Sequence, residues 1–230
     1  MSLTARAAAG ESTQCPLCHA PERVPFLEEP GRRYLHCDVC DLIFVHASDL
    51  PTRAEEAQRY LAHQNDRGDP GYVAFLRRLA DPLCERVPLR AVGIDVGCGP
   101  APVLSELLST TGRPTRYYDP QFFPDRAPLR ETYDFVTCCE VVEHAHDPAV
   151  LFTQLVGLLR PHGVLGVMTS LRDPHAEFAR WWYRRDTTHV CFYSMRTLQW
   201  VAEHFDMTLS VPASNVALFT LLRGPGVDTA

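Results

Sequence analysis

Short apolar runs alternate with amphipathic segments over the second half of the chain. Strands are predicted at 91–96, 115–118, 133–139, 164–169, 207–211 and 216–222, and helices at 103–109, 149–159 and 197–204. Apolar runs of strand length followed by helical periodicity indicate repeated strand–helix units. The pattern predicts an α/β fold with a doubly wound, mostly parallel, Rossmann-like sheet, whose ligands bind at the carboxyl ends of its strands.

The first half of the chain has a different character. Residues 1–12 are Ala-rich and have no pattern, so they are predicted to be a flexible leader. Residues 51–90 have helical periodicity broken by Gly-Asp-Pro-Gly at 68–71, which predicts two helices acting as a connector or cap. Together with a cysteine-bearing segment at 13–50 and the α/β region at 91–230, this divides the chain into four parts.

Four cysteines in the 13–50 segment form two C-x-x-C pairs, Cys15 with Cys18 and Cys37 with Cys40. Two such pairs can surround one zinc ion with four thiolates, and the closed set of ligands indicates a structural zinc ribbon. The alternative is four buried cysteines that bind nothing. The ribbon is acidic, which favours a role in stabilising the fold or shaping a substrate cleft over binding of nucleic acid.

Composition excludes several classes of function. The chain has 230 residues, 46% of them hydrophobic, and all 22 of its basic residues are Arg. Without Lys it cannot be a Schiff-base enzyme or a Walker-type NTPase. A net charge of -6 argues against a nucleic-acid partner, and the absence of a long apolar run argues against a membrane. Unpaired cysteines in apolar segments suggest a cytoplasmic protein. Nothing predicts its oligomeric state.

A glycine turn follows the first strand of the α/β region, as Asp95-Val-Gly97-Cys-Gly99. Asp119 follows the next strand, where a carboxylate can accept hydrogen bonds from ribose hydroxyls. Dinucleotides and S-adenosylmethionine are both bound by such an arrangement. Pro102 stands where the dinucleotide fingerprint requires a small residue, which argues against NAD. A tight turn with an unrelated surface Asp is the alternative without a ligand.

These motifs resemble the class I S-adenosylmethionine-dependent methyltransferases. The resemblance rests on residues 94–99, Asp119, residues 133–144 and the Leu-Leu-Arg-Pro-His-Gly turn at 158–163. It implies a cofactor site made of Asp95, Gly97, Cys98, Gly99, Asp119, Pro120 and Cys139. Ala101 replaces the family's usual third glycine. Only about fifteen residues separate Asp119 from the next predicted strand, so the family's third strand is predicted to be short or missing. Pro120 and Phe122 would then cover the adenine.

The acceptor side of the site is predicted from Glu140, Glu143 and His144, followed much later by His189. If a helix starts at Glu140, the first three project from one face. The quartet is similar to one in plant small-RNA 2'-O-methyltransferases and ubiquinone-pathway O-methyltransferases, where the resemblance implies a divalent cation such as Mg²⁺. Glu140, His144 and His189 are the catalytic candidates, with a histidine as direct general base if no cation binds. A helix-start Glu beside an ordinary His is the structural alternative.

The sequence therefore predicts methyl transfer from S-adenosylmethionine to a small-molecule acceptor, preferably at a hydroxyl oxygen. One alternative is a C-methyltransferase acting on a nucleotide-linked sugar, because such enzymes resemble this chain in their N-terminal cysteine-rich zinc module. A non-catalytic binding module that keeps the fold is another, and an NAD-dependent oxidoreductase is a third. An aromatic and Arg-rich cluster at 178–185 either stacks on the acceptor or packs as a lid.

Overall fold

A six-stranded sheet forms the centre of the molecule. The computed structural model describes residues 14–21, 23–61 and 67–222. The sheet order is β5-β4-β6-β7-β10-β9, in which β4 to β7 run parallel and β10 is antiparallel to both of its neighbours. The strands are β4 (Gly93–Val96), β5 (Thr115–Tyr118), β6 (Tyr133–Cys139), β7 (Leu159–Met168), β9 (Met207–Ala213) and β10 (Val216–Leu221). The predicted doubly wound, mostly parallel sheet is confirmed.

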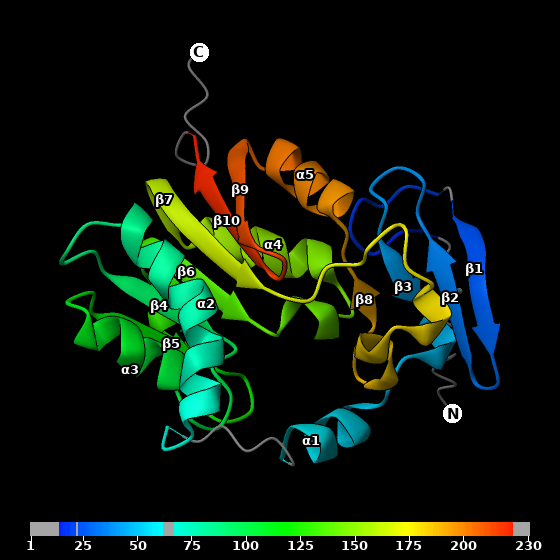
Figure 1. Cartoon of the computed structure of the whole chain (residues 1–230), viewed down its shortest axis with the longest axis horizontal. Helices are drawn as coiled ribbons and strands as arrows, with labels where there is room; N and C mark the ends of the chain where they lie inside the picture. The colour runs from blue at the N-terminus through cyan, green and yellow to red at the C-terminus, as the bar shows by residue number, and fades with distance from the viewer. Residues whose placement is uncertain (1–13, 22, 62–66, 223–230) are drawn as a thin grey trace, which may run out of the picture.

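Helices cover both faces of this sheet (Figure 1). One face carries α2 (Pro70–Arg86) and α3 (Val103–Thr110), and the other carries α4 (Pro148–Gly157) and α5 (Met195–His204). Neighbouring strand residues divide between the two apolar cores: Phe135 packs with the α2 and α3 side chains, whereas Val136 packs with those of α4 and α5. A strand buried on both faces needs a continuous apolar run, which is the pattern seen in the sequence.

A second, four-stranded sheet lies beside the first one (Figure 1). Its order is β1-β2-β3-β8, from β1 (Val24–Glu29), β2 (Arg32–His36), β3 (Ile43–Val45) and β8 (Cys191–Phe192). The β1–β2 hairpin turns at Pro30-Gly31, where Gly31 has a φ of 77°. Since β8 comes from the far end of the chain, the cysteine segment and the α/β region share a sheet, and their side chains also share one apolar core.

The remaining elements are short. Helix α1 (Arg53–Leu61) lies between the small sheet and α2 (Figure 1). The 3-10 helices are η1 (Ala47–Asp49), η2 (Ala127–Arg130), η3 (Val142–His144), η4 (Phe178–Arg180) and η5 (Trp182–Arg185). None of the helices in the described residues combines the length and the apolar character needed to cross a bilayer.

The predicted elements are all present, with shifted ends. β7 starts at Leu159 instead of at residue 164, because it pairs with Tyr133 before an irregularity in the register. The third strand of the family is missing: between β5 and β6 the chain forms only η2 and an isolated bridge from Asp119 to Phe123. β5 is therefore an edge strand. The predicted leader at 1–12 lies outside the described residues.

Candidate functional site

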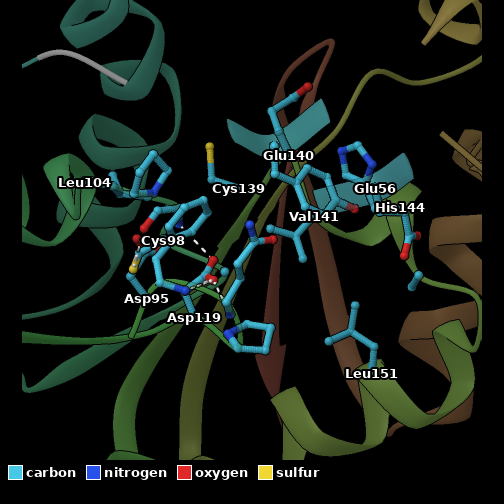
Figure 2. A pocket seen from close by; sticks show the side chains of 18 of the residues that line it. Glu56, Asp95, Cys98, Leu104, Asp119, Cys139, Glu140, Val141, His144 and Leu151 are labelled. Atoms are coloured by element: carbon cyan, nitrogen blue, oxygen red, sulfur yellow. Dashed lines mark hydrogen bonds between the residues drawn. The ribbon is translucent and has the colours of Figure 1, made fainter. Parts of the chain in front are cut away.

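A cavity of about 760 Å³ opens at the carboxyl ends of β4, β5 and β6. Figure 2 shows Asp95, Cys98 and Asp119 on one side of it and Glu56 and His144 on the other. This volume falls in the range of small-molecule sites. All the predicted cofactor residues line it: Asp95, Gly97, Cys98, Gly99, Asp119, Pro120 and Cys139. Glu140, His144 and His189 line it as well.

The glycine turn passes directly from β4 into the cavity wall. Gly97 has a φ of 81° and Gly99 a φ of 68°, which favour glycine. The Gly97 amide donates a hydrogen bond to the Tyr118 carbonyl over 2.8 Å. A Cβ on Gly97 would lie 2.5 Å from a Val141 methyl group. The space at Gly97 is therefore needed for the Val141 side chain.

Asp119 is held rigidly at the end of β5. Its side chain is buried and accepts hydrogen bonds from three backbone amides: Gly99 at 3.0 Å, Gln121 at 2.8 Å and Phe122 at 3.0 Å. A carboxylate offers about four acceptor positions, so roughly one is left for a ligand. The glycine turn, Asp119 and the following loop therefore form one hydrogen-bonded unit, with Pro120 and Phe122 beside it in the cavity wall.

Asp95 lies deeper in the same wall. Only 3% of the residue is exposed, and the Thr137 hydroxyl donates a hydrogen bond to its carboxylate over 2.7 Å. Burial, together with repulsion from Asp119, raises the pKa of Asp95 to about 7. A cationic group bound in the cavity would favour the ionised form of Asp95.

Glu140 directly follows β6 and has a left-handed conformation with a φ of 51°. Its Oε2 lies 3.2 Å from the Tyr183 hydroxyl oxygen, whereas Oε1 is buried without a partner among the described residues. Burial, reinforced by the neighbouring Glu143 carboxylate, raises the pKa of Glu140 to about 8. The Oε1 atom of Glu140 is thus a buried acceptor without a hydrogen bond from the described part of the chain.

The helix that would place Glu140, Glu143 and His144 on one face does not start at Glu140. The chain instead makes the single 3-10 turn η3, so the residues do not share a helix face. Ligand atoms of Glu143, His144 and His189 still come within 4.8 Å of one another, but Glu140 is outside this group. Glu143 is fully buried and accepts hydrogen bonds from the hydroxyls of Tyr183 at 2.5 Å and Thr169 at 2.9 Å.

The two histidines present the same ring nitrogen to the site. Nδ1 of His189 is 2.7 Å from the Tyr183 carbonyl oxygen, and Nδ1 of His144 is 3.1 Å from that of Thr188. A carbonyl only accepts, so each Nδ1 carries a proton, and a ring with that tautomer keeps the lone pair of Nε2. Burial lowers the pKa of His189. The pair can therefore accept a proton or, with Glu143, coordinate a cation.

The four cysteines of the ribbon converge as predicted. The Sγ atoms of Cys15 and Cys40 are 3.6 Å apart and those of Cys18 and Cys37 are 3.4 Å apart, and all four lie within 4.8 Å of one another. These distances exclude disulfides. Four sulfurs around a zinc ion at 2.3 Å would be about 3.8 Å apart, so the donor set and its spacing fit zinc.

Several lining residues were not predicted from sequence. Tyr60 of α1 and Tyr72 of α2 line the cavity, as do Arg53 and Glu56. No motif marked them, because only the fold brings α1 over the sheet. Tyr183 belongs to the aromatic and Arg-rich cluster at 178–185, and nothing in its spacing predicted its contacts with the Glu140 and Glu143 carboxylates. None of that cluster lines the cavity, which favours the packing interpretation.

Comparison with known proteins places the chain in a family. The family model described as a methyltransferase domain matches residues 55–210. A ubiquinone biosynthesis O-methyltransferase from Saccharophagus degradans is 32% identical over 139 residues, which are 59% of this chain and 54% of that protein. The corresponding enzyme from Proteus mirabilis is 31% identical over 93 residues, or 40% and 38%. The matched segments thus span about half or less of these relatives.

Solved structures agree on the fold. The 1,6-didemethyltoxoflavin-N1-methyltransferase of Burkholderia thailandensis superposes with a TM-score of 0.52 at 15% identity, covering 85% of this chain and 96% of that one. Human N-acetylserotonin methyltransferase superposes with a TM-score of 0.50 at 13% identity, and the match covers 66% of this chain and 52% of that one. At such identities the likeness concerns the fold alone. With more than half of its residues matched by the family model, this chain belongs to the methyltransferase domain family, with the class I fold.

Proposed function

We propose that this protein transfers the methyl group of S-adenosylmethionine to a hydroxyl oxygen of a small molecule. One observation carries the proposal: a single cavity joins the buried Asp119 carboxylate and glycine turn to two histidines with open Nε2 atoms. A donor held at the first end would present its methyl group toward the second. Family membership supports the reaction type, and the similarity to O-methyltransferases supports oxygen as the acceptor atom.

The cofactor half of the cavity fits an adenosyl group with a positively charged tail. Asp119 would accept the ribose hydroxyls with its remaining acceptor position. Pro120 and Phe122 would cover the adenine in place of the missing third strand. Asp95 would face positive charge, which its pKa of about 7 allows near neutral pH. S-adenosylmethionine supplies an electrophilic methyl group when it is bound.

The acceptor half fits removal of a proton from a hydroxyl group. His189 is neutral near physiological pH because burial lowers its pKa, and its Nδ1–H is fixed by the Tyr183 carbonyl. Its Nε2 would therefore take the acceptor's proton as the hydroxyl oxygen attacks the methyl group. Glu140 would line the acceptor's side of the cavity beside the two histidines. We assign His189 as the base, with His144 beside it.

A divalent cation is the alternative to a direct base, because Nε2 of His189 cannot bind a metal and accept a proton at the same time. Glu143, His144 and His189 offer one carboxylate oxygen and two imidazole nitrogens, a donor set suited to divalent metals such as Mg²⁺ or a softer ion. A cation bound there would lower the pKa of the acceptor hydroxyl. Glu143 is already hydrogen-bonded to two hydroxyls, which would orient it toward that cation.

We also assign the parts of the chain. Residues 13–50 form a ribbon whose Cys15, Cys18, Cys37 and Cys40 hold a structural zinc ion, residues 51–90 form a helical cap, and residues 91–230 form the methyltransferase part. Four thiolates leave no open position on the metal, so its contribution is to folding. The ribbon joins the α/β region through β8 and a shared core.

Calorimetry and a methylation assay test this function. S-adenosylmethionine should bind the purified protein, and tritiated methyl groups should pass to a catechol such as 3,4-dihydroxybenzoate, which offers two neighbouring oxygens. His189→Gln should lower kcat at least about 100-fold and leave cofactor affinity unchanged. His175→Gln, an exposed histidine outside the cavity, is the control. Unchanged turnover of His189→Gln would contradict the assignment of the base.

Two observations favour alternatives, and the same experiments separate them. The four-cysteine ribbon resembles the module of nucleotide-sugar C-methyltransferases. Methylation of a deoxythymidine-diphosphate sugar at carbon, with one zinc per chain and no second divalent requirement, would establish that function instead. The edge position of β5 weakens the adenine site compared with the full family fold. If S-adenosylmethionine failed to bind at high micromolar concentration, the chain would be a non-catalytic binding module.

A further inference from the structure

We propose that the four-cysteine ribbon acts as a clamp on the loop that carries His189, and that Arg32 is the positioning residue of this clamp. The clamped loop comprises residues 183–192. The inference rests on the proposed function only for what His189 does. That the ribbon determines where its imidazole lies is argued from contacts alone, and it is tested separately.

The first contact is a strand pairing. β8 begins two residues after His189 and pairs with β3 of the ribbon, with Phe192 opposite Ile43 and Cys191 opposite Phe44. The Val45 amide extends the ladder by donating to the Val190 carbonyl over 2.9 Å. The main chain directly after His189 is therefore an added strand of the ribbon sheet, although the two segments are far apart in sequence.

Arg32 holds the main chain just before β8. Its guanidinium donates to the carbonyl of Thr187 over 2.8 Å and to the carbonyl of His189 itself. A planar guanidinium with two donors in fixed positions sets the direction as well as the distance of both carbonyls. Arg32 lies on β2, two strands away from β8 in the same sheet. The ribbon thus contacts the backbone on both sides of Thr188.

The surroundings of Arg32 indicate orientation instead of simple stabilisation. Both carbonyls are neutral, and its Nε is buried without a partner among the described residues. Burial lowers the pKa of Arg32, so its charge is held here at a cost. The Arg32 guanidinium also lies over the Tyr34 ring, 5.5 Å from its centroid, and both of its hydrogen-bond acceptors are carbonyls of the loop. What it provides is a defined geometry for the His189 loop.

The hydrogen-bond partner of the His189 ring is anchored to the ribbon too. His189 Nδ1 binds the Tyr183 carbonyl, and the next residue, Arg184, makes a bidentate ion pair with Glu29 of β1 at 2.6 and 2.8 Å. Only 13% of the Arg184 side chain is exposed. One ribbon strand therefore fixes the backbone of His189, and another fixes the segment that orients its ring.

A fourth contact comes from the cysteine knuckle. Asp41 directly follows Cys40 and has a φ of 61°. Its carboxylate pairs with Arg172 and His36 at 2.7 Å each and accepts a hydrogen bond from Ser194, just after β8. Since the knuckle would be shaped by its metal, the position of the His189 loop follows from the integrity of the zinc ribbon.

Two neighbouring arginines provide a matched test. Arg33 sits beside Arg32 on β2 but pairs with Asp49 inside the ribbon, at 2.7 Å. Arg32→Met and Arg33→Met each remove one guanidinium from the ribbon, and Arg32→Met removes the two hydrogen bonds to the loop carbonyls of Thr187 and His189. Zinc content and S-adenosylmethionine affinity are measured first, and both variants should match the wild type in each.

The direct readout is the loop itself. Hydrogen exchange of amides in 186–192 should be at least about tenfold faster in Arg32→Met and unchanged in Arg33→Met. Nitrogen-15 spectra of the imidazoles should show that His189 loses its single Nδ1–H tautomer in Arg32→Met. Removal of zinc by a chelator should reproduce both effects. If the exchange rates and the His189 tautomer were the same in the two variants, the proposed clamp would be wrong.

Activity measurements then show the functional consequence. Arg32→Met should lower kcat about tenfold or more and leave the KM for S-adenosylmethionine unchanged. Arg32→Lys should recover only part of the lost kcat, because an ammonium group cannot bind two carbonyls in the fixed geometry of a guanidinium. If His189→Gln left kcat unchanged, the proposed base would fail while the exchange result still decided the clamp. If Arg32→Met did not fold, Glu29→Gln would replace it. This variant breaks the ion pair with Arg184, and its hydrogen exchange and kcat would be compared with those of Arg33→Met in the same way.

Discussion

The two halves of the cavity are built in contrasting ways. The cofactor half comes from one short stretch, the end of β4, the glycine turn and the end of β5, joined by hydrogen bonds from Gly97 to Tyr118 and from Gly99 to Asp119. The acceptor half combines α1, η3 and the loop at 183–192, and the ribbon supports that loop from behind. In the proposed function a compact local motif would bind the donor, whereas distant segments would converge to form the acceptor site.

This difference implies unequal tolerance to change. A local motif keeps its shape as long as its own strands pair, because the turn and its hydrogen bonds lie within neighbouring residues. A site assembled from distant segments depends on every contact between them. Variants in the ribbon should therefore damage the acceptor half first, and variants at the glycine turn should damage the cofactor half first.

The largest effect is expected from loss of zinc. Chelation, or Cys37→Ser, should lower the free energy of unfolding by on the order of 5 kcal/mol, since a structural zinc site contributes its binding energy to folding. Cys84→Ser, outside the ribbon, is the control. Thermal melting with metal analysis measures both variants. A ribbon that melted no earlier without metal would show that the four cysteines are not a zinc site.

The second largest effect is expected for Gly97→Ala. This change should lower the free energy of unfolding by about 3 kcal/mol, because the added methyl group meets Val141 and the backbone at this position is left-handed. Urea unfolding measures the loss. Val141→Ala in the same chain should restore the part caused by the clash and leave about 1 kcal/mol from the backbone. Full restoration would mean that the conformation of Gly97 is unimportant.

Asp119→Asn should weaken S-adenosylmethionine binding about 30-fold, or about 2 kcal/mol. The amide cannot accept all three backbone N–H bonds, and its own N–H groups would face those donors. Isothermal calorimetry provides the measurement. Asp125→Asn, on an exposed carboxylate of the same loop, should bind normally. Equal affinity of both variants for S-adenosylmethionine would show that the Asp119 carboxylate does not contribute to cofactor binding.

The smallest effect concerns pH. Burial raises the pKa of Asp95 to about 7, and a bound cation favours its ionised form. As the pH falls from 8 to 6 the free protein takes up a proton that binding must release, so cofactor affinity should fall by up to about tenfold. Asp95→Asn should remove this component from the calorimetric pH profile. The same slope in both proteins would show that Asp95 does not face the cofactor's charge.

Sequence reasoning was most accurate where chemistry depends on neighbouring residues. The strand before Gly97, the carboxylate at Asp119 and the missing third strand are local consequences of strand length and turn composition, and the fold bears them out. The convergence of the four cysteines was likewise implicit in their spacing. The spacing alone left open a helix starting at Glu140, and it does not form because Glu140, directly after β6, has a left-handed backbone conformation.

The sequence by itself determined the fold class, the glycine turn with its acidic partner and the cysteine quartet, since each is set by short-range periodicity or spacing. Only the tertiary structure decided that Tyr183 bridges two carboxylates, that α1 covers the cavity and that Arg32 holds the loop of His189. These contacts join residues far apart along the chain. Their geometry comes from the packing of whole sheets, and no local pattern of side chains encodes it.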